Sequence, residues 1–349
     1  MTCQVLLLSP SRGLGGGIER YAETLEWAFA AEGVACQRLD LSGPGARAHA
    51  RMLADGRVVL RADPEHTRLV VAHRALLPLA ALLAREPSAC GVSVLCHGAE
   101  MWDARWRLRR RVERRLMRRP GVRVVAVSSF TAGVLQRDCK AAVLPPALSQ
   151  RWFDTLSGAA AAGRAGAPGI QLATTFRLTE WREKGLPELI AAVEALGRPD
   201  IRLAIYGSGH PPCGLLQLLA GHNWCVLRQG LADDDLAREL AMADLFVLAT
   251  RTRPGRRSSG EGFGIALLEA QAAGTPVIVP AHGGSHDAYA EGVTGVAPAD
   301  ESAEALTQSL DDLLKDPDRL AGMGKRAATW AREAFAPERY AQLAVRRLL

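Results

Sequence analysis

Long apolar runs are missing from this chain of 349 residues. The most apolar stretch, Leu69–Ala84, is interrupted by His73 and Arg74, and it falls short of the roughly 18 uninterrupted apolar residues that a membrane span needs. The N-terminus also lacks a basic flank before its apolar residues Val5–Leu8, which favours a first buried strand over a signal peptide. We therefore expect a cytoplasmic protein that does not cross a bilayer.

Cysteine motifs are also absent. The seven cysteines are scattered, and no two of them form a C-x-x-C pair. This spacing excludes both a disulfide framework and a cysteine zinc site, so we expect reduced thiols. No suitable loop carries a D-x-D pair of carboxylates, and we accordingly predict no metal.

Lysine is scarce, with four lysines among 43 basic residues, so the abundance of arginine alone indicates little. Its distribution is more informative. The segment Arg105–Arg119 holds nine arginines and one acid, Glu113, so it carries +8 while the rest of the chain sums to −2. Its apolar residues Leu108, Val112 and Leu116 form a narrow helical stripe. The segment is either a surface helix with a solvated cationic face or an attachment to an anionic membrane surface. No aromatic pattern accompanies the arginines, so nucleic-acid binding is not expected.

Short apolar runs alternate with helical patterns along both halves of the chain, which predicts α/β structure with parallel sheets. Hydrophobic residues make up 48% of the chain and charged residues 23%, as in globular proteins. In the first half, the helix Ile18–Glu32 accompanies the apolar runs Val5–Leu8, Arg57–Leu60, Leu69–Ala72, Val92–Cys96 and Val122–Val127. In the second half, helices at 186–196 and 264–273 and a further segment at 236–242 accompany the runs 170–174, 201–206, 225–228, 245–249 and 277–279.

The length of the chain predicts two domains. Residues 157–169 are rich in Gly and Ala without periodicity, as expected of an exposed connection. We therefore predict an N-terminal domain over 1–156, a linker over 157–169 and a C-terminal domain over 170–349, whose last helix could pack back on the N-terminal domain. Two doubly wound domains in tandem would place a ligand cleft between the carboxyl ends of two sheets.

The strongest motif is a glycine-rich turn that opens a helix. Glu261 directly precedes the turn, and Glu269, eight residues later, lies within the predicted helix. Amides in the turn and the positive end of the helix dipole could hold a phosphate. One carboxylate could then reach a sugar while the other accepts hydrogen bonds from a ribose diol. Alternatively, Glu261 only complements the dipole and Glu269 is a surface charge. The residues predicted to contact the nucleotide through this turn are Gly262, Phe263, Gly264 and Ile265.

This run resembles the E-x7-E signature of retaining nucleotide-sugar glycosyltransferases with the GT-B fold, in the large family 4. The resemblance extends over nearly the whole chain. It implies two Rossmann-like doubly wound domains facing each other across a cleft. It also implies transfer of a hexose or N-acetylhexosamine from a nucleoside-diphosphate sugar to a hydroxyl acceptor, with retention of configuration. In such a reaction the departing phosphate takes the proton of the acceptor. No further cofactor and no metal are implied.

In the N-terminal half, the family's glycine-rich loop after the first strand corresponds to Gly15–Tyr21, with Gly16 and Gly17 as the predicted donor contacts. The segment around His97 resembles the strand-end H-G element whose histidine lies beside the donor sugar, which implies a catalytic role. A histidine bonded only to loop backbone is the alternative. Ser128 matches a later strand-end serine with a capping role.

In the C-terminal half, Arg177 and Lys184 resemble the family's R-L…K-G element, which grips the diphosphate, so both are predicted to stabilise the leaving phosphate. Their separation by six residues is longer than usual, and Arg182 is a competing cation. The G-x-G turn after a later strand and the segment that contacts the base correspond to Gly207, Gly209 and Leu231.

The loop Thr250–Gly260 is rich in arginine and resembles that of phosphatidylinositol mannosyltransferase-like members. It either contacts an anionic group or is a solvated loop. The loop favours GDP-mannose as the donor, with UDP-sugars as the alternative. The acceptor could be a glycolipid, a polysaccharide precursor or a small metabolite.

Two alternative functions are a nucleotide-sugar epimerase on the same scaffold and a non-catalytic sugar-nucleotide sensor.

Overall fold

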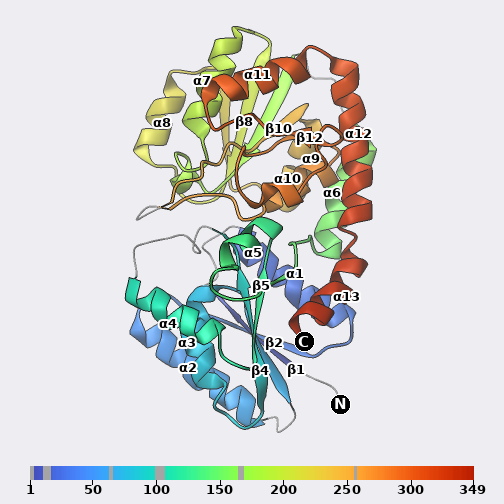
Figure 1. Cartoon of the computed structure of the whole chain (residues 1–349). Helices are drawn as coiled ribbons and strands as arrows, with labels where there is room; N and C mark the ends of the chain where they lie inside the picture. The colour runs from blue at the N-terminus through green and yellow to red at the C-terminus, as the bar shows by residue number, and fades with distance from the viewer. Residues whose placement is uncertain (1–3, 11–16, 63–65, 99–106, 164–168, 255–257) are drawn as a thin grey trace. The chain divides into compact units, whose positions relative to one another are not determined.

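The computed structural model describes residues 4–10, 17–62, 66–98, 107–163, 169–254 and 258–349, which form two compact units (Figure 1). Unit 1 comprises residues 1–149, 254–258 and 337–349, and unit 2 comprises residues 150–253 and 259–336. Within the described ranges, none of the helices has the length and apolar content that a membrane span requires.

Unit 1 is built on a parallel sheet with the strand order β2-β1-β3-β4-β5-β6. Its strands are β1 (Gln4–Ser9), β2 (Cys36–Asp40), β3 (Thr67–Val71), β4 (Ala89–Cys96), β5 (Val122–Ala126) and β6 (Ala142–Val143). Its helices are α1 (Gly17–Ala31), α2 (Ala46–Ala62), α3 (Leu77–Leu83), α4 (Arg107–Met117), α5 (Ser129–Leu135), α13 (Pro337–Leu348) and the 3-10 helix η1 (Arg74–Leu76). Helix α13 packs against α1.

Unit 2 repeats the plan with the order β12-β11-β10-β7-β8-β9, again parallel. Its strands are β7 (Ile170–Thr175), β8 (Ile201–Gly207), β9 (Cys225–Gln229), β10 (Leu245–Val247), β11 (Val277–Ile278) and β12 (Gly295–Val296). Its α-helices are α6 (Gln150–Ala162), α7 (Leu186–Leu196), α8 (Cys213–Ala220), α9 (Asp233–Met242), α10 (Ile265–Ala272), α11 (Ala303–Leu314) and α12 (Pro317–Ala334). The 3-10 helices are η3 (Leu178–Glu180) and η4 (Gly284–Asp287).

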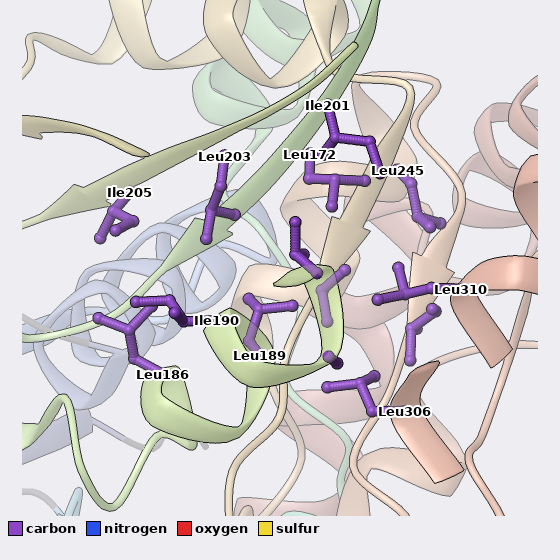
Figure 2. Close-up of a cluster of buried hydrophobic side chains, with 14 of the residues drawn as sticks. Leu172, Leu186, Leu189, Ile190, Ile201, Leu203, Ile205, Leu245, Leu306 and Leu310 are labelled. Atoms are coloured by element: carbon purple, nitrogen blue, oxygen red, sulfur yellow. The ribbon is translucent and has the colours of Figure 1, made fainter. Parts of the chain in front are cut away.

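The core of unit 2 shows why these segments take these conformations. Helix α7 places Leu186, Leu189 and Ile190 on one side, at the spacing of a helical face. Figure 2 shows this face among side chains from β7, β8 and β10 and from α11, including Leu203 and Leu310. The central strands β7 and β10 are mostly buried because a parallel sheet is covered on both faces, whereas the edge strand β9 ends in the exposed residues Arg228 and Gln229.

The two parallel sheets confirm the predicted α/β class, but several details differ from the sequence-based expectation, among them the following three. The run Arg57–Leu60 lies inside helix α2, where Val58 is exposed, and does not form a strand. Strand β2 was not predicted, because its side chains Cys36–Asp40 are mixed in polarity and only half-buried. The chain enters unit 2 at Gln150, earlier than the predicted boundary, and 157–162 belongs to helix α6 instead of a linker.

Candidate active site

The strand order of unit 2 reverses direction between β7 and β10, and three polar side chains meet near the carboxyl ends of these strands. Open parallel sheets bind their ligands outside the carboxyl ends at such a point. Here the Nζ of Lys184 lies 2.9 Å from the Oε2 of Glu261, and the hydroxyl of Thr250 donates to the same oxygen at 3.2 Å. The structure thus brings together Lys184 and Glu261, which were predicted separately.

Gly185 fixes the position of Lys184. It is the N-cap of α7 and has φ = 71°, a left-handed conformation that side chains with a Cβ rarely adopt. A Cβ at this position would lie 1.9 Å from the carbonyl oxygen of Ala249, which follows β10. Glycine is therefore needed both for the turn and for its close approach to the end of the strand.

The Lys184–Glu261 pair is largely shielded from water, with the two side chains 21% and 15% exposed. Desolvation works against the charged form of Lys184. The adjacent carboxylate of Glu261 and the charge of Glu180 outweigh this effect, so the pKa of Lys184 is raised above its ordinary value. The site therefore holds a permanent cation at neutral pH.

Residues 262–264, which follow Glu261, form the turn that leads into the N-terminus of α10. Gly264 is its N-cap with φ = 92°, and Phe263 is buried with its ring edge against Phe335 at 5.7 Å between centroids. The carbonyl of Glu261 accepts the amide of Gly284 at 2.8 Å, which ties this turn to η4. The first amides of a helix have no intrahelical acceptors and point along the positive end of the dipole. Gly262, Phe263, Gly264 and Ile265 thus have the backbone arrangement that suits a phosphate.

Glu269 lies one helical turn inside α10, as the motif requires, but it is not a surface charge. Its side chain is buried, and its Oε1 accepts the indole N–H of Trp152 at 2.9 Å. The alternative of a solvated helix charge is therefore wrong. Binding of ribose by Glu269 stays a prediction.

The two arginines near Lys184 have different surroundings. Arg177 follows β7 as the N-cap of η3, and its guanidinium bonds to Glu180 at 3.0 Å. Arg182 lies over the ring of Trp181, 3.8 Å from the ring centroid. Arg177, whose charge also acts on Lys184, is therefore the better candidate for a second cation beside the phosphate.

The other predicted residues of unit 2 lie on neighbouring turns. Gly207 ends β8, and a Cβ there would lie 2.4 Å from the carbonyl oxygen of Phe176. The carbonyl of Gly209 accepts the side-chain amide of Gln229 at 3.1 Å. Leu231 follows β9 and is half-buried. These turns follow the carboxyl ends of strands, as predicted.

In unit 1, His97 follows β4 and belongs to a small aromatic cluster. Its Nε2 lies 2.6 Å from the carbonyl oxygen of Ala72, which can only accept, so this nitrogen carries the proton. The ring stacks on His73 with 5.9 Å between centroids and meets Tyr21 of α1 edge-on at 5.6 Å. Gly17 begins α1, and Gly16 lies outside the described residues.

Helix α4 does not bury the apolar stripe that its sequence predicts. Leu108 and Val112 are 76% and 45% exposed, whereas Leu116 is buried. The buried face instead contains Glu113, which pairs with Arg74 of η1 at 3.0 Å and with Arg109 at 2.8 Å. The exposed face therefore combines two apolar side chains with arginines.

The arginine-rich loop is partly described. Arg251 pairs with Glu188 of α7, and the amide of Thr252 donates to Glu301 at 2.6 Å. Arg253 pairs through its backbone with Ser259, and 255–257 lie outside the described residues. At least one arginine of this loop is thus held by the protein itself.

Sequence reasoning missed Thr250, Trp152 and His73. Thr250 follows a strand, and that position was a usable signal. Trp152 and His73 gave none, because each contacts a residue that is distant in the sequence, Glu269 and His97 respectively.

Comparison with known proteins shows a family likeness in the C-terminal half of the chain. Residues 177–330 match the family model described as glycosyl transferases group 1. A curated relative from Mycolicibacterium smegmatis, a GDP-mannose-dependent alpha-(1-6)-phosphatidylinositol monomannoside mannosyltransferase, is 39% identical over 103 residues, which is 30% of this chain and 27% of the relative. A D-inositol 3-phosphate glycosyltransferase from Gordonia bronchialis is 36% identical over 112 residues, 28% of this chain and 24% of the relative. The chain thus spans about a quarter of these relatives' length.

Solved structures match over almost the whole chain. The Anabaena protein Alr3699/HepE, in complex with UDP and glucose, has a TM-score of 0.75 at 17% identity over 99% of both chains. A sucrose-phosphate synthase from Thermosynechococcus elongatus has a TM-score of 0.75 at 18% identity over 98% of both chains. At such identities the likeness shows the fold, and the fold is GT-B.

Proposed function

We propose that this chain, which matches the model of the group 1 glycosyltransferases over residues 177–330, is a retaining glycosyltransferase that uses a nucleoside-diphosphate sugar. The observation that carries the proposal is the Lys184–Glu261 pair at the carboxyl ends of β7 and β10, beside the N-terminus of α10. A fixed cation, free helix amides and a carboxylate in one place suit a diphosphate joined to a sugar.

In this proposal the positive charges act on the leaving group. As the bond between the anomeric carbon and the diphosphate oxygen breaks, negative charge grows on that oxygen. Lys184, Arg177 and the first amides of α10 would stabilise this charge. They would also supply the positive charge that a metal provides elsewhere, so we propose a metal-independent reaction.

The remaining roles follow from the chemistry of each group. Glu261 would accept a hydrogen bond from a donor-sugar hydroxyl, and Glu269 from the ribose. His97 would contact the sugar near the reacting carbon. The hydroxyl of the acceptor would attack the face that the phosphate leaves, with the departing phosphate taking its proton, so the anomeric configuration is retained. This stereochemistry is supported by the family resemblance.

The names of the curated relatives suggest the substrates. One acts with GDP-mannose on a phosphatidylinositol monomannoside, and another is a D-inositol 3-phosphate glycosyltransferase. We therefore propose GDP-mannose as the first donor to test, with UDP-sugars second, because the structural neighbour binds UDP and glucose. We propose an acceptor that carries inositol or another polyol.

We also propose that α4 attaches the protein to an anionic membrane surface on the cytoplasmic side. Its exposed face carries Leu108 and Val112 together with Arg111 and Arg115, and the exposed Arg119 follows the end of the helix. Basic residues near such a surface contribute about 1 kcal/mol each. The burial of Glu113 supports this proposal, because the helix packs through that face and leaves the other outward.

A thermal-shift screen against nucleoside diphosphates and their sugars tests the donor assignment. A ligand at 100 times its dissociation constant adds about 2.7 kcal/mol to the free energy of unfolding. We expect GDP and GDP-mannose to raise the melting temperature of the wild type more than that of Lys184→Ala. A wild type that responds to no nucleoside diphosphate or nucleotide sugar would contradict the proposal.

A further inference from the structure

Glu269 has an indole as the partner of its carboxylate. The Nε1 of Trp152 donates to Oε1 at 2.9 Å, with the two residues 7% and 5% exposed. A carboxylate at this depth needs a hydrogen-bond donor, because its desolvation is otherwise costly. The partner comes from α6, the first helix after the chain enters unit 2, and is 117 residues away in the sequence.

An indole is a rigid donor. Trp152 has two side-chain torsions, and its ring is buried on α6, which packs against both α9 and α10. Its N–H therefore restrains the position of Oε1 and limits the orientations open to the carboxylate. A carboxylate oriented in advance binds hydroxyl donors more tightly than one that must be ordered on binding.

We propose that Trp152 is a positioning residue for the ribose of the nucleotide: it anchors one oxygen of Glu269 so that the carboxylate is aimed at the ribose hydroxyls. The inference rests on the proposed function, since Glu269 meets ribose only if unit 2 binds a nucleotide. It adds a residue outside the glycine-rich turn and the E-x7-E motif, and this residue acts through Glu269 instead of touching the ligand.

The experiment compares ribose and 2′-deoxyribose nucleotides in Trp152→Phe, which removes the N–H and keeps an aromatic ring. Calorimetry with GDP, UDP and their 2′-deoxy forms gives the dissociation constants. We expect Trp152→Phe to weaken binding of the preferred ribonucleotide about tenfold and of its 2′-deoxy form about threefold or less. The preference for ribose should therefore shrink. Phe153→Leu, a change at the adjacent buried position of α6, is the matched control and should leave both constants unchanged.

Two further variants separate positioning from packing. Trp152→His keeps a ring N–H and should recover part of the preference for ribose. In a Glu269→Gln background, Trp152→Phe should add little to the loss, because the carboxylate that it positions is already gone. Equal weakening of ribose and 2′-deoxyribose ligands by Trp152→Phe, or the same pattern in Phe153→Leu, would overturn the inference while leaving the proposed function intact. A wild type that binds no nucleotide would overturn both.

Discussion

At the scale of single residues, the account depends on a cation and a carboxylate that stabilise each other before any ligand arrives. Lys184 and Glu261 are 77 residues apart in the chain, and their contact keeps both charged groups in place in a largely shielded site. Such a pair presents a cation to a phosphate without the cost of ordering a flexible side chain.

We expect Lys184→Ala to lower kcat by roughly 100- to 1,000-fold, because its charge is most needed as the phosphate departs. Steady-state kinetics with the donor found in the thermal screen would measure this. Arg182→Ala is the control, and it should stay within about threefold of wild type because Arg182 stacks on Trp181. If the two variants exchanged these effects, Arg182 would be the phosphate-binding residue.

The raised pKa of Lys184 predicts a pH dependence of stability. A raised pKa means that the folded state binds this proton more tightly, so the stabilisation is fully present below the pKa of an unfolded lysine and is lost as pH rises through the folded value. We expect Glu261→Gln to lower the free energy of unfolding by about 1–3 kcal/mol near neutral pH. This difference from wild type should shrink above about pH 10.4 in denaturant titrations, and growth of the difference there would contradict the assignment.

Candidate site residues that belong to local sequence motifs could be predicted from the sequence, whereas residues that contribute through tertiary contacts could not. Lys184, Glu261 and Glu269 belong to local motifs, so short segments were enough to predict them. Trp152 acts only through a tertiary contact, and nothing near it in the sequence marks it. The burial of Glu269 was missed for the same reason, since its partner lies on another helix.

At the scale of elements, both ends of α7 carry a glycine in the left-handed conformation. Comparing them separates the cost of that backbone conformation from the cost of a steric clash with a Cβ. Gly185→Ala combines the left-handed conformation, worth about 1–2 kcal/mol, with a Cβ that would collide with the Ala249 carbonyl. Gly197→Ala meets the same conformation with no atom within 4 Å. We expect a loss of about 3 kcal/mol or more for the first and about 1–2 kcal/mol for the second in urea unfolding. Equal losses would mean that the turn can move away from β10.

Helix α4 allows a comparison between a buried and an exposed ion pair. Glu113→Ala leaves the largely buried guanidinium of Arg74 without this carboxylate, so we expect a loss of about 3–5 kcal/mol. Arg114→Gln breaks a pair with Asp138 in which the arginine is 46% exposed, and it should cost at most about 1 kcal/mol. Chemical denaturation measures both, and a small loss for Glu113→Ala would show that α4 is not held through this residue.

The exposed face of α4 gives the test of membrane attachment. Replacing Arg111, Arg115 and Arg119 by Gln should weaken binding to anionic vesicles by about 3 kcal/mol at low salt, with activity on a water-soluble acceptor retained. Exposed arginines at 137, 151 and 202 provide a control with the same change in charge. Sedimentation with vesicles measures the binding. If both triple variants sedimented alike, only net charge would matter, and a wild type that does not sediment would contradict the proposal.

Most elements were predictable because a strand of a parallel sheet is a continuous apolar run. The exceptions have physical reasons. Residues 57–60 read as a strand because three apolar residues in a row suit a strand or a helix, and only burial, which differs between Val58 and Leu60, distinguishes them. Strand β2 has half-buried side chains, so its sequence carries little apolar signal.

At the scale of the whole molecule, the chain divides into two units, each with its own sheet and core. The tandem alternation predicted this plan, but not the point at which the chain passes from one unit to the other. Gly- and Ala-rich residues suggested a linker, yet alanine is also the best helix former, and 157–162 complete α6. Composition alone could not separate these two outcomes.

The most direct test of the central claim is proton NMR of the purified protein with GDP-mannose, then UDP-sugars, and a polyol acceptor. The account predicts that nucleoside diphosphate appears together with a glycoside of the same anomeric configuration as the donor. It also predicts that both signals grow roughly 100- to 1,000-fold more slowly in Lys184→Ala. An inverted product, an isomerised donor without consumption of acceptor, or full activity in Lys184→Ala would contradict the account.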